Sequence, residues 1–274
     1  MSSVQSNMYP RLIDICDDAP FWSAPFGLVL LDRVRVRPVM AVVDVGTGTG
    51  FPLVELAQRL GSKCRVVGVD PSPDALARAQ SKLDVWGVSH VELIVARAEN
   101  LPLDTASVDL VISNNGLNNV DDLPTALSEC ARICKVGAQL VFTFNLPGTF
   151  IEFYSVLEQV LEVRGLVAEL ERMRRHIFTL RKSVEYMRHA VSAAGFTTID
   201  VVESQWRYRF ASAEALFDHG FFRVAFIPAW NALFSDVQQR SEVFNVAKLA
   251  LEQTVQSQGE LAMSVPFACF DCRR

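Results

Sequence analysis

The sequence predicts an α/β protein built on a doubly wound parallel sheet. Short β-branched runs alternate with longer amphipathic segments from Val39 to about Asn145, and a glycine-rich turn follows the first of these runs. Such alternation is typical of right-handed βαβ units, in which helices cover both faces of a parallel sheet. The first run, VMAVVDV, is apolar enough for a strand that is buried on both faces.

The predicted strands and helices of this core follow one another along the chain. Ser72 can cap a helix that begins at Pro73, and Gly61, Gly87 and Gly137 follow predicted helix ends. The expected strands are 39–45, 64–70, 91–96, 108–114 and 138–145, and the expected helices are 52–60, 73–87 and 123–135.

The remaining chain predicts further helices and strands within one domain, 1–274. Residues 149–175 and 212–258 have helical periodicity, and FTTIDVVES between them favours a strand. The last strand is either WRYRF or the terminal LAMSVPFACFD, and we favour the second, which makes the later helical block an insertion. The expected parts are an N-terminal helical cap (1–38), a core (39–148), two helical segments (149–175 and 212–258) and a terminal strand (259–274).

Composition and charge restrict the partners of the protein. Hydrophobic residues make up 50% of the 274 residues, and the formal net charge is −5. No apolar stretch approaches membrane-spanning length, and the N-terminus lacks a basic segment followed by an apolar one. We therefore expect a cytoplasmic protein without an integral membrane segment. Basic residues are scattered apart from ERMRRH, which disfavours nucleic acid and polyanionic substrates as partners. The oligomeric state stays open.

The six cysteines are expected to be reduced, with small buried side chains. Cys130 and Cys134 are spaced to share a helix face, whereas Cys269 and Cys272 form a C-x-x-C pair in a segment that favours a strand. No second C-x-x-C or H-x-x-x-H motif completes a set of four metal ligands, so we expect no metal site.

The glycine-rich turn predicts a nucleotide-like cofactor. Gly46, Gly48 and Gly50 lack Cβ atoms, so their backbone can take unusual dihedral angles and approach a ligand closely. The dinucleotide fingerprint G-x-G-x-x-G would need glycine where Phe51 stands, which disfavours NAD. Asp70 ends the second predicted strand, where a carboxylate can accept hydrogen bonds from both ribose hydroxyls of an adenosine.

At these residues the sequence resembles the class I S-adenosylmethionine (SAM) dependent methyltransferases, especially the ubiquinone/menaquinone biosynthesis branch. The resemblance covers roughly residues 41–148. It implies a Rossmann-like, mostly parallel seven-stranded sheet, SAM as the cofactor, and a lid formed by the helical segments 149–175 and 212–258. The segments that carry it are VVDVGTGTG, VVGVDPSPDALARAQ, ARAENLPLDTASVDLVISNNGLNNV and ECARICKVGAQLVFTFNLPG.

The resemblance also implies which residues contact SAM. Asp44 and the turn up to Gly50 would lie along its methionine and ribose parts, and Asp70 would hold the ribose hydroxyls. Ala98 would present its backbone to the adenine, and Asn114 would face the sulfonium. The implied cofactor-binding residues are Asp44, Gly46, Thr47, Gly48, Gly50, Asp70, Pro71, Ala98, Glu99 and Asn114.

One position departs from the family pattern. The family commonly has an acid before the alanine, which accepts a hydrogen bond from the adenine amino group. This sequence has Arg97 there, and a guanidinium cannot accept a hydrogen bond. Either Arg97 points away and stacks, or the neighbouring Glu99 takes the place of the acid.

The predicted reaction is methyl transfer to an apolar or aromatic small-molecule acceptor by in-line displacement, which mainly requires alignment and exclusion of water. The aromatic residues between Phe217 and Trp230 are too many for one buried helix face, so some are expected to line an apolar acceptor pocket. The candidate catalytic residues are His176, His219 and Asn115, and His189, Glu152 and Tyr154 are further candidate bases.

Three other functions stay open at the level of sequence. A SAM-binding domain without catalysis would bind SAM and never consume it. An NAD-dependent oxidoreductase would use a similar sheet. A methyltransferase acting on a thiophilic element such as arsenic would need Cys269, Cys272 and another thiol to converge.

Overall fold

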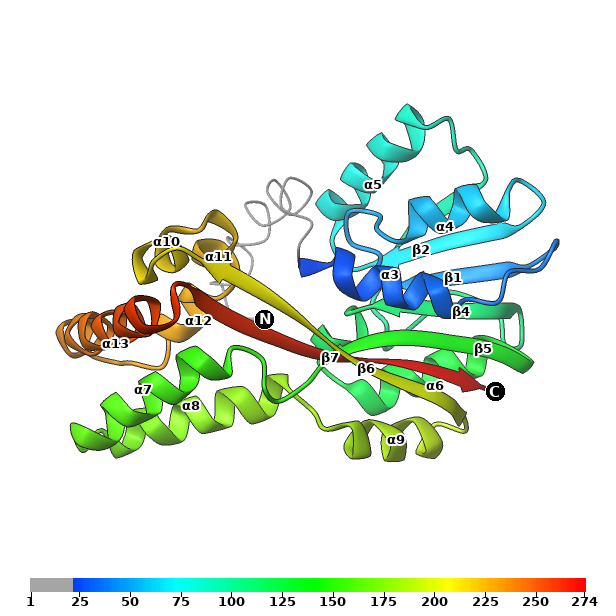
Figure 1. Cartoon of the computed structure of the whole chain (residues 1–274). Coiled ribbons are helices and arrows are strands. Elements are labelled where there is room, and N and C mark those ends of the chain that lie inside the picture. Colours follow the sequence, from blue (N-terminus) through cyan, green and yellow to red (C-terminus); the bar gives the residue numbers. More distant parts are fainter. Residues whose placement is uncertain (1–21) are drawn as a thin grey trace. The chain divides into compact units, whose positions relative to one another are not determined.

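The computed structural model describes residues 22–274, which form two compact units (Figure 1). The sheet unit comprises residues 22–145, Ser183–Ser204 and Phe267–Arg274. The helical unit comprises Leu146–Lys182 and Gln205–Pro266. The part of the predicted N-terminal cap that precedes residue 22 lies outside the described residues.

The chain forms one seven-stranded sheet with the order β3-β2-β1-β4-β5-β7-β6. Strands β1, β2, β3, β4 and β5 pair in parallel, and β7 pairs antiparallel with β5. This order confirms the predicted Rossmann-like, mostly parallel sheet. The strands are β1 (Ala41–Val45), β2 (Arg65–Asp70), β3 (Val91–Val95), β4 (Val108–Asn114), β5 (Cys134–Asn145), β6 (Thr197–Phe210) and β7 (Leu261–Arg273).

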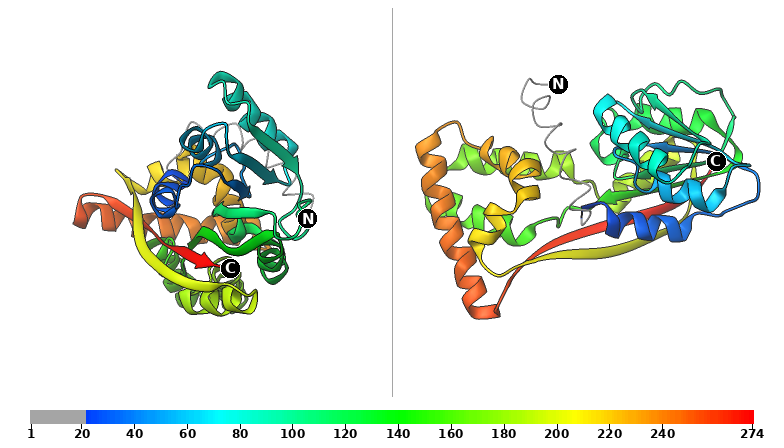
Figure 2. Two further views of the ribbon diagram at one scale, coloured as in Figure 1. Left: turned by 90° about the vertical axis from the view of Figure 1, so that its right-hand side faces the viewer. Right: turned by 90° about the horizontal axis from the view of Figure 1, so that it is seen from above.

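Helices cover both faces of the sheet unit. Helices α3 (Ala24–Arg33) and α4 (Leu53–Leu60) pack on one face, with α5 (Pro73–Val85) beside α4. Helices α6 (Leu123–Ile133) and α9 (Val184–Ala193) pack together on the other face (Figure 2). Because both faces are covered, the inner strands are buried along most of their length, as their continuous apolar sequence requires.

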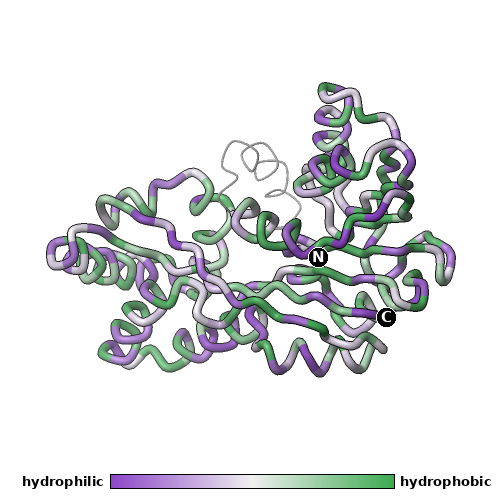
Figure 3. The backbone as a smooth tube through the Cα atoms, turned by 45° about the vertical axis from the view of Figure 1, so that its right-hand side comes forward, coloured by the Kyte–Doolittle hydropathy of each residue, from purple (hydrophilic) through white to green (hydrophobic). Residues whose placement is uncertain are grey.

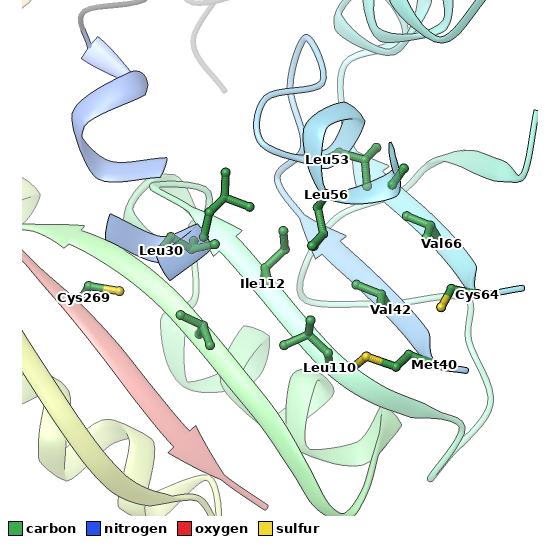
Figure 4. Packing of buried hydrophobic residues seen from close by; sticks show 13 residues of the cluster. Leu30, Met40, Val42, Leu53, Leu56, Cys64, Val66, Leu110, Ile112 and Cys269 are labelled. Atoms are coloured by element: carbon green, nitrogen blue, oxygen red, sulfur yellow. The ribbon is translucent and has the colours of Figure 1, made fainter. Parts of the chain in front are cut away.

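The core on the α3 and α4 face shows how the strand pattern produces this packing. Leu30 of α3 and Leu56 of α4 lie against Val42, Leu110 and Ile112 of the sheet (Figure 4). All five side chains are at most 1% exposed. Burying one such side chain fully contributes about 1.5–3 kcal/mol relative to leaving it in water. This layer therefore fixes the strands whose ends carry the polar residues described below.

Of two helix boundaries predicted from the sequence, the structure confirms one and contradicts the other. The Ser72 hydroxyl accepts a hydrogen bond from the Ala75 N–H at 3.2 Å, which confirms the predicted cap of α5. The helix predicted over 123–135 instead ends at Ile133, and Cys134 begins β5. Cys130 and Cys134 therefore do not share a helix face, because pairing of Cys134 with β4 overrides its helical spacing.

The helical unit is arranged around its longest described helix, α13 (Val237–Gln258). Helix α7 packs on both α8 and α13, and α10 packs on α13 (Figure 1). Hydrophilic and hydrophobic residues alternate along these helices (Figure 3), as expected for helices with one buried face. The helices are α7 (Ile151–Val163), α8 (Val167–Leu180), α10 (Ala213–Asp218), α11 (Gly220–Ala225), α12 (Ile227–Asn231) and α13 (Val237–Gln258).

The strands near the end of the chain resolve the earlier choice between two segments. WRYRF forms the last part of β6, and the terminal segment forms β7, so both candidates are strands. The helices α10 to α13 lie between these two strands in sequence. None of the helices within residues 22–274 combines the length and apolar character that crossing a bilayer requires.

The helical unit is held together by an aromatic cluster formed by Phe150, Phe153, Phe222 and Trp230. The Phe153 and Trp230 rings stack with centroids 3.9 Å apart, and Phe150 packs on Phe222 at 5.2 Å. Aromatic pairs of this kind contribute about 0.5–1.5 kcal/mol beyond their buried area. The aromatic residues between Phe217 and Trp230 are distributed over three short helices, so no single helix face has to hold them.

Candidate active site

The first strand of the sheet unit carries a buried carboxylate. Asp44 in β1 is fully buried, and its Oδ2 accepts a hydrogen bond from the Thr47 hydroxyl at 2.8 Å. No described residue bonds to its Oδ1. Burial raises the pKa of Asp44 to about 7, with the bond from Thr47 opposing this change and the charge of Asp70 adding to it. Asp44 is thus a carboxyl group that is poised to change charge near neutral pH.

The turn after β1 is closed at its base and open in its middle. Its Gly46 N–H donates to the Val69 carbonyl at 2.8 Å. Gly46, Gly48 and Gly50 have φ angles of 76°, 54° and 100°, which side chains with a Cβ rarely adopt. A Cβ on Gly46 would lie 2.6 Å from the Gly116 Cα, whereas nothing lies within 4 Å of a Cβ on Gly48. A ligand can therefore approach the backbone at Gly48.

Asp70 at the end of β2 organises this turn. Its Oδ2 accepts a hydrogen bond from the Gly48 N–H at 2.9 Å, and its Oδ1 accepts one from the Ser72 N–H at 2.9 Å. Burial raises the pKa of Asp70, and the two backbone bonds oppose this rise. Each carboxylate oxygen keeps a second lone pair, so Asp70 can still accept hydrogen bonds from two hydroxyl groups. Pro71, the next residue, is exposed.

Two asparagines follow one another where β4 ends. The Asn114 side chain is engaged, because its Nδ2 donates to the Ser23 carbonyl at 3.1 Å and its Oδ1 accepts from the Thr143 hydroxyl at 3.0 Å. The Asn115 N–H donates to the same Thr143 oxygen at 3.0 Å. Thr143 was not among the predicted site residues. Its only signal in the sequence is a hydroxyl within the apolar run of β5.

Four side chains at this edge of the sheet keep buried polar atoms without a hydrogen-bond partner among residues 22–274. They are Asp44, Asn115, Asn118 of the short helix η2 (Leu117–Asn119) and Asn145 at the end of β5, and we refer to them as the strand-end cluster. Both amide atoms of Asn115 are unpartnered, and Asn118 Nδ2 donates to Asn145 Oδ1 at 3.4 Å. A buried polar group without a partner costs about 1–3 kcal/mol. A polar ligand would remove this cost.

The segment after β3 binds to the loop that follows η2. Ala98 is buried, and its neighbours Arg97 and Glu99 both contact that loop. Glu99 Oε1 accepts hydrogen bonds from the N–H groups of Asp121 and Asp122 at 3.0 and 3.3 Å. Arg97 Nη2 donates to Asp121 Oδ2 at 2.6 Å. The Arg97 guanidinium thus forms an ion pair at the surface, and one carboxylate oxygen of Glu99 is already used by the loop.

His176 belongs to the helical unit, in α8. Its Nε2 lies 3.2 Å from the Tyr154 hydroxyl, which also accepts a hydrogen bond from Trp230 Nε1 at 3.1 Å. Burial and the charge of Arg181 lower the pKa of His176. The imidazole is therefore neutral at pH 7, and its Nε2 can accept the Tyr154 proton. Trp230, Tyr154 and His176 form a continuous chain of polar groups inside an aromatic environment.

His219 also belongs to the helical unit but lies in a different setting. It follows α10, and its ring packs on the rings of Tyr208, Phe210 and Phe222 with centroid distances of 6.1, 5.7 and 5.6 Å. Its Nδ1 is buried without a partner in the described structure. Burial lowers the pKa of His219. The predicted catalytic residues are thus divided, with both histidines in the helical unit and Asn115 in the sheet unit.

Of the other candidate bases, His189 is exposed on α9, whereas Glu152 has a structural partner. Glu152 accepts hydrogen bonds from the N–H and the hydroxyl of Ser264 at 2.9 and 2.5 Å. The five cysteines within the described residues are free and buried, whereas Cys16 lies outside them. Burial raises the pKa of both Cys269 and Cys272 to about 12. Those two thiols are therefore neutral at physiological pH, and Cys269 packs in the core layer under α3.

Comparison with known proteins identifies relatives of this arrangement. A family model described as a methyltransferase domain matches residues 43–142. The chain is 36% identical over 125 residues to malonyl-(acyl-carrier protein) O-methyltransferase 1 of Coxiella burnetii, a match that covers 46% of this chain and 40% of that protein. It is 27% identical over 179 residues to the ubiquinone/menaquinone biosynthesis C-methyltransferase UbiE of Idiomarina loihiensis, covering 62% of this chain and 71% of that protein.

A solved structure extends the likeness in fold to most of the chain. The YcgJ protein of Bacillus subtilis superposes with a TM-score of 0.56, covering 90% of this chain and 95% of that one at 17% sequence identity. The curated sequence matches are shorter, and the chain spans only 40% of the length of the Coxiella relative. At such low identity the structural likeness concerns the fold alone.

The strand ends of the sheet unit fit the methyl donor of this family, SAM, which carries ribose hydroxyls and a sulfonium cation. Asp70 keeps lone pairs for hydroxyl groups, and the space beside Gly48 is open. The unpartnered Oδ1 of Asp44 is a buried acceptor at the same edge. From the sheet order, these strand ends and the matched family model, residues 43–142 belong to the class I SAM-dependent methyltransferases and form the methyltransferase domain of this chain.

Proposed function

We propose that this chain transfers the methyl group of SAM to an apolar or aromatic small-molecule acceptor by in-line displacement. The observation that carries the proposal is the strand-end cluster beside the open glycine turn, whose buried polar atoms lack partners among residues 22–274. Proteins seldom keep such atoms unpartnered in a structural core. The cluster lies at the carboxyl ends of parallel strands, where ligands bind in open α/β sheets.

The residues of the sheet unit would bind and orient the two reactants. Bound SAM supplies an activated methyl group on a cationic leaving group. Asp70 would accept hydrogen bonds from the ribose hydroxyls, and Gly48 would let the backbone approach the cofactor. Neither the donor nor the acceptor of the Asn115 amide has a partner among the described residues, and with these atoms Asn115 would orient a polar group of the methyl acceptor.

The residues of the helical unit are candidates for proton removal. Burial lowers the pKa of His176 and of His219, so both imidazoles are neutral at pH 7 and able to accept a proton. Such a base assists when the nucleophile is a hydroxyl or a carbon acid. Of the two, His219 keeps a buried ring nitrogen without a partner in the described structure, whereas His176 is bonded to Tyr154.

The apolar character of the acceptor is supported by the pocket of the helical unit that Ile151, Ile177 and Phe178 line. Small-molecule sites are lined mostly by hydrophobic and aromatic side chains with a few polar groups that fix orientation. One relative is named for its acceptor, malonyl-acyl-carrier protein, and another for ubiquinone/menaquinone biosynthesis. This chain shares parts of their sequences, so methylation of a small organic molecule is the proposal that these names favour.

The cofactor assignment is tested by replacing Asp70 with alanine. Asp70→Ala removes the acceptor of both ribose hydroxyls, and we expect the SAM dissociation constant to rise about 10- to 100-fold, since bonds to charged groups contribute about 1.5–3 kcal/mol. Titration calorimetry measures this change. The matched control is Asp104→Ala, an exposed acid in the same unit, which should leave the affinity unchanged. Equal affinities for all three proteins would contradict the ribose assignment.

The reaction is tested with methyl-labelled SAM and a cell extract separated into protein, nucleic-acid, polar and solvent-extractable fractions. We expect label in the solvent-extractable fraction, and less of it after Asp70→Ala at the same SAM concentration. Label in protein or nucleic acid would contradict the small-molecule acceptor. Tight SAM binding without transfer to any fraction would favour a SAM-binding domain that performs no catalysis.

A further inference from the structure

A pocket in the helical unit has a lining that points to its ligand. Helices α7 and α8 lie side by side (Figure 1), and the pocket between them encloses about 250 Å³. This is close to the lower end of the range of about 300–1,000 Å³ that is typical of small-molecule sites. Ile151 and Phe178 line the pocket although they are 52% and 74% exposed. The pocket therefore presents uncovered apolar surface.

Arg181 lines this pocket, and it has no anionic partner in the part of the chain that the structure describes. It follows the last residue of α8, and among residues 22–274 no carboxylate forms an ion pair with it. Its Nη1 donates to the Leu180 carbonyl at 3.1 Å, which leaves most of its five N–H donors free. Burial lowers the pKa of the Arg181 guanidinium, with Tyr154 opposing this change. A largely buried cation without a counter-ion is costly, so an anionic ligand would stabilise it.

The second arginine of the pocket, Arg174, does have an anionic partner. Arg174 lies on α8 and bonds to Glu158 Oε1 through Nε at 3.0 Å and through Nη2 at 2.7 Å. Glu158 also lines the pocket, so these two charges cancel each other. Arg181 has no such carboxylate partner among residues 22–274. The Nζ of the next residue, Lys182, lies over the Phe178 ring, 4.8 Å from its centre.

The neutral polar group of the pocket is fixed in position by its own partners. The Tyr154 hydroxyl accepts from Trp230 Nε1 and lies 3.2 Å from His176 Nε2. Burial raises the pKa of Tyr154, so the hydroxyl stays protonated at neutral pH. Tyr154 therefore supplies no counter-charge to Arg181. The lining as a whole combines one uncompensated guanidinium, one fixed hydroxyl and several apolar side chains.

We propose that this pocket binds a small organic anion, in which one carboxylate or ionised phenol pairs with Arg181 and an apolar body lies against Ile151, Ile177 and Phe178. Guanidinium groups recognise carboxylates through two parallel hydrogen bonds, which a single free fork such as that of Arg181 can form. As a statement of the acceptor's chemical class, this inference rests on the proposed methyl transfer. As a statement about binding, it stands by itself.

The test compares acids with their uncharged amides of the same shape. Binding of benzoate and benzamide, of 2-naphthoate and 2-naphthamide, and of octanoate and octanamide is measured by titration calorimetry. We expect the wild-type protein to bind the acid of at least one pair about tenfold or more tightly than its amide. Arg181→Met should abolish that preference, and Arg181→Lys should keep part of it because the charge remains.

The control is Arg175→Met, an exposed arginine on the same helix that does not line the pocket, and it should keep the full preference. SAM affinity measured in the same samples shows that each variant is folded. The proposal is overturned if no pair is distinguished by the wild-type protein, or if folded Arg181→Met still prefers the acid. Acid preference without any methyl transfer would contradict the proposed function and leave the anion site in place.

Discussion

The strand-end cluster of the sheet unit and the aromatic cluster of the helical unit treat buried polar atoms in opposite ways. In the strand-end cluster, Asp44, Asn115 and two further asparagines keep buried atoms without partners in the described structure. In the aromatic cluster, the one polar atom of Trp230 donates to Tyr154, and the rings fill the space around it.

Whether buried polar atoms have hydrogen-bond partners distinguishes residues that stabilise the fold from residues that are suited to bind a ligand. Satisfied and closely packed side chains contribute to stability, so their removal should destabilise the protein. Unsatisfied buried groups reduce stability, and they persist where a ligand satisfies them. Three substitutions test whether the two clusters differ in this way.

The largest effect is expected from Trp230→Ala in the aromatic cluster. Trp230 is 1% exposed, so its removal leaves a cavity. It also removes the Nε1–H group that donates a hydrogen bond to the Tyr154 hydroxyl. We expect the free energy of unfolding to fall by about 3–5 kcal/mol. Urea denaturation followed by circular dichroism measures it. The control Trp86→Ala removes a side chain that is 66% exposed and should change stability by less than about 0.5 kcal/mol.

An effect that depends on pH is expected from Asp44→Asn. The pKa of Asp44 is raised from its ordinary value of 3.8 to about 7, so the folded protein holds the proton more tightly than the unfolded chain does. Stability should therefore fall as pH rises between these two values, by at most about 1.4 kcal/mol for each pH unit, and then level off.

Asparagine carries no charge and keeps an acceptor for Thr47, so the Asp44→Asn variant should lack this part of the pH dependence. Its stability relative to the wild-type protein should increase from pH 4 to pH 7. Urea denaturation at a series of pH values measures the difference. A constant difference over that interval would show that the buried carboxyl group does not titrate in this way.

The smallest effect on stability is expected from Asn115→Gly. Asn115 has a φ of 60°, which glycine adopts more easily, and its amide makes no hydrogen bond in the described structure. Stability should stay the same or rise by up to about 1 kcal/mol. Under the proposed function, kcat/KM should nevertheless fall about tenfold, because the amide orients the acceptor. A variant that is both less stable and fully active would place Asn115 with the structural residues.

The parts of the molecule that sequence reasoning reached are those that depend on local patterns. The alternating runs predicted the strand and helix order, and the glycines with Asp70 predicted a turn that Asp70 itself holds through Gly48. These features depend on neighbours in the chain or on the regular geometry of βαβ units. The apolar strand pattern is repeated in every inner strand, so a single misread residue does not change the result.

The parts that sequence reasoning missed depend on contacts between distant segments. Thr143 acts on Asn114 and Asn115 only because β5 pairs with β4. The roles of Arg97 and Glu99 depend on a loop more than 20 residues away, to which Glu99 is bonded through two N–H groups. The lack of a carboxylate partner for Arg181 among residues 22–274 could not be predicted from the sequence, because it depends on where every acid of the folded chain lies. The identity of the methyl acceptor could not be predicted either, because it depends on which distant side chains line the pocket in the folded chain.

The position of β7 in the sheet has a consequence for the order in which the chain can fold. Strand β7 lies between β5 and β6, although it follows both in sequence. During synthesis, the apolar edge of β5 therefore stays open until residues 267–273 emerge and pair with it. An open strand edge is a template for pairing with other chains. The nascent chain thus has a period of exposure to aggregation that only its final strand brings to an end.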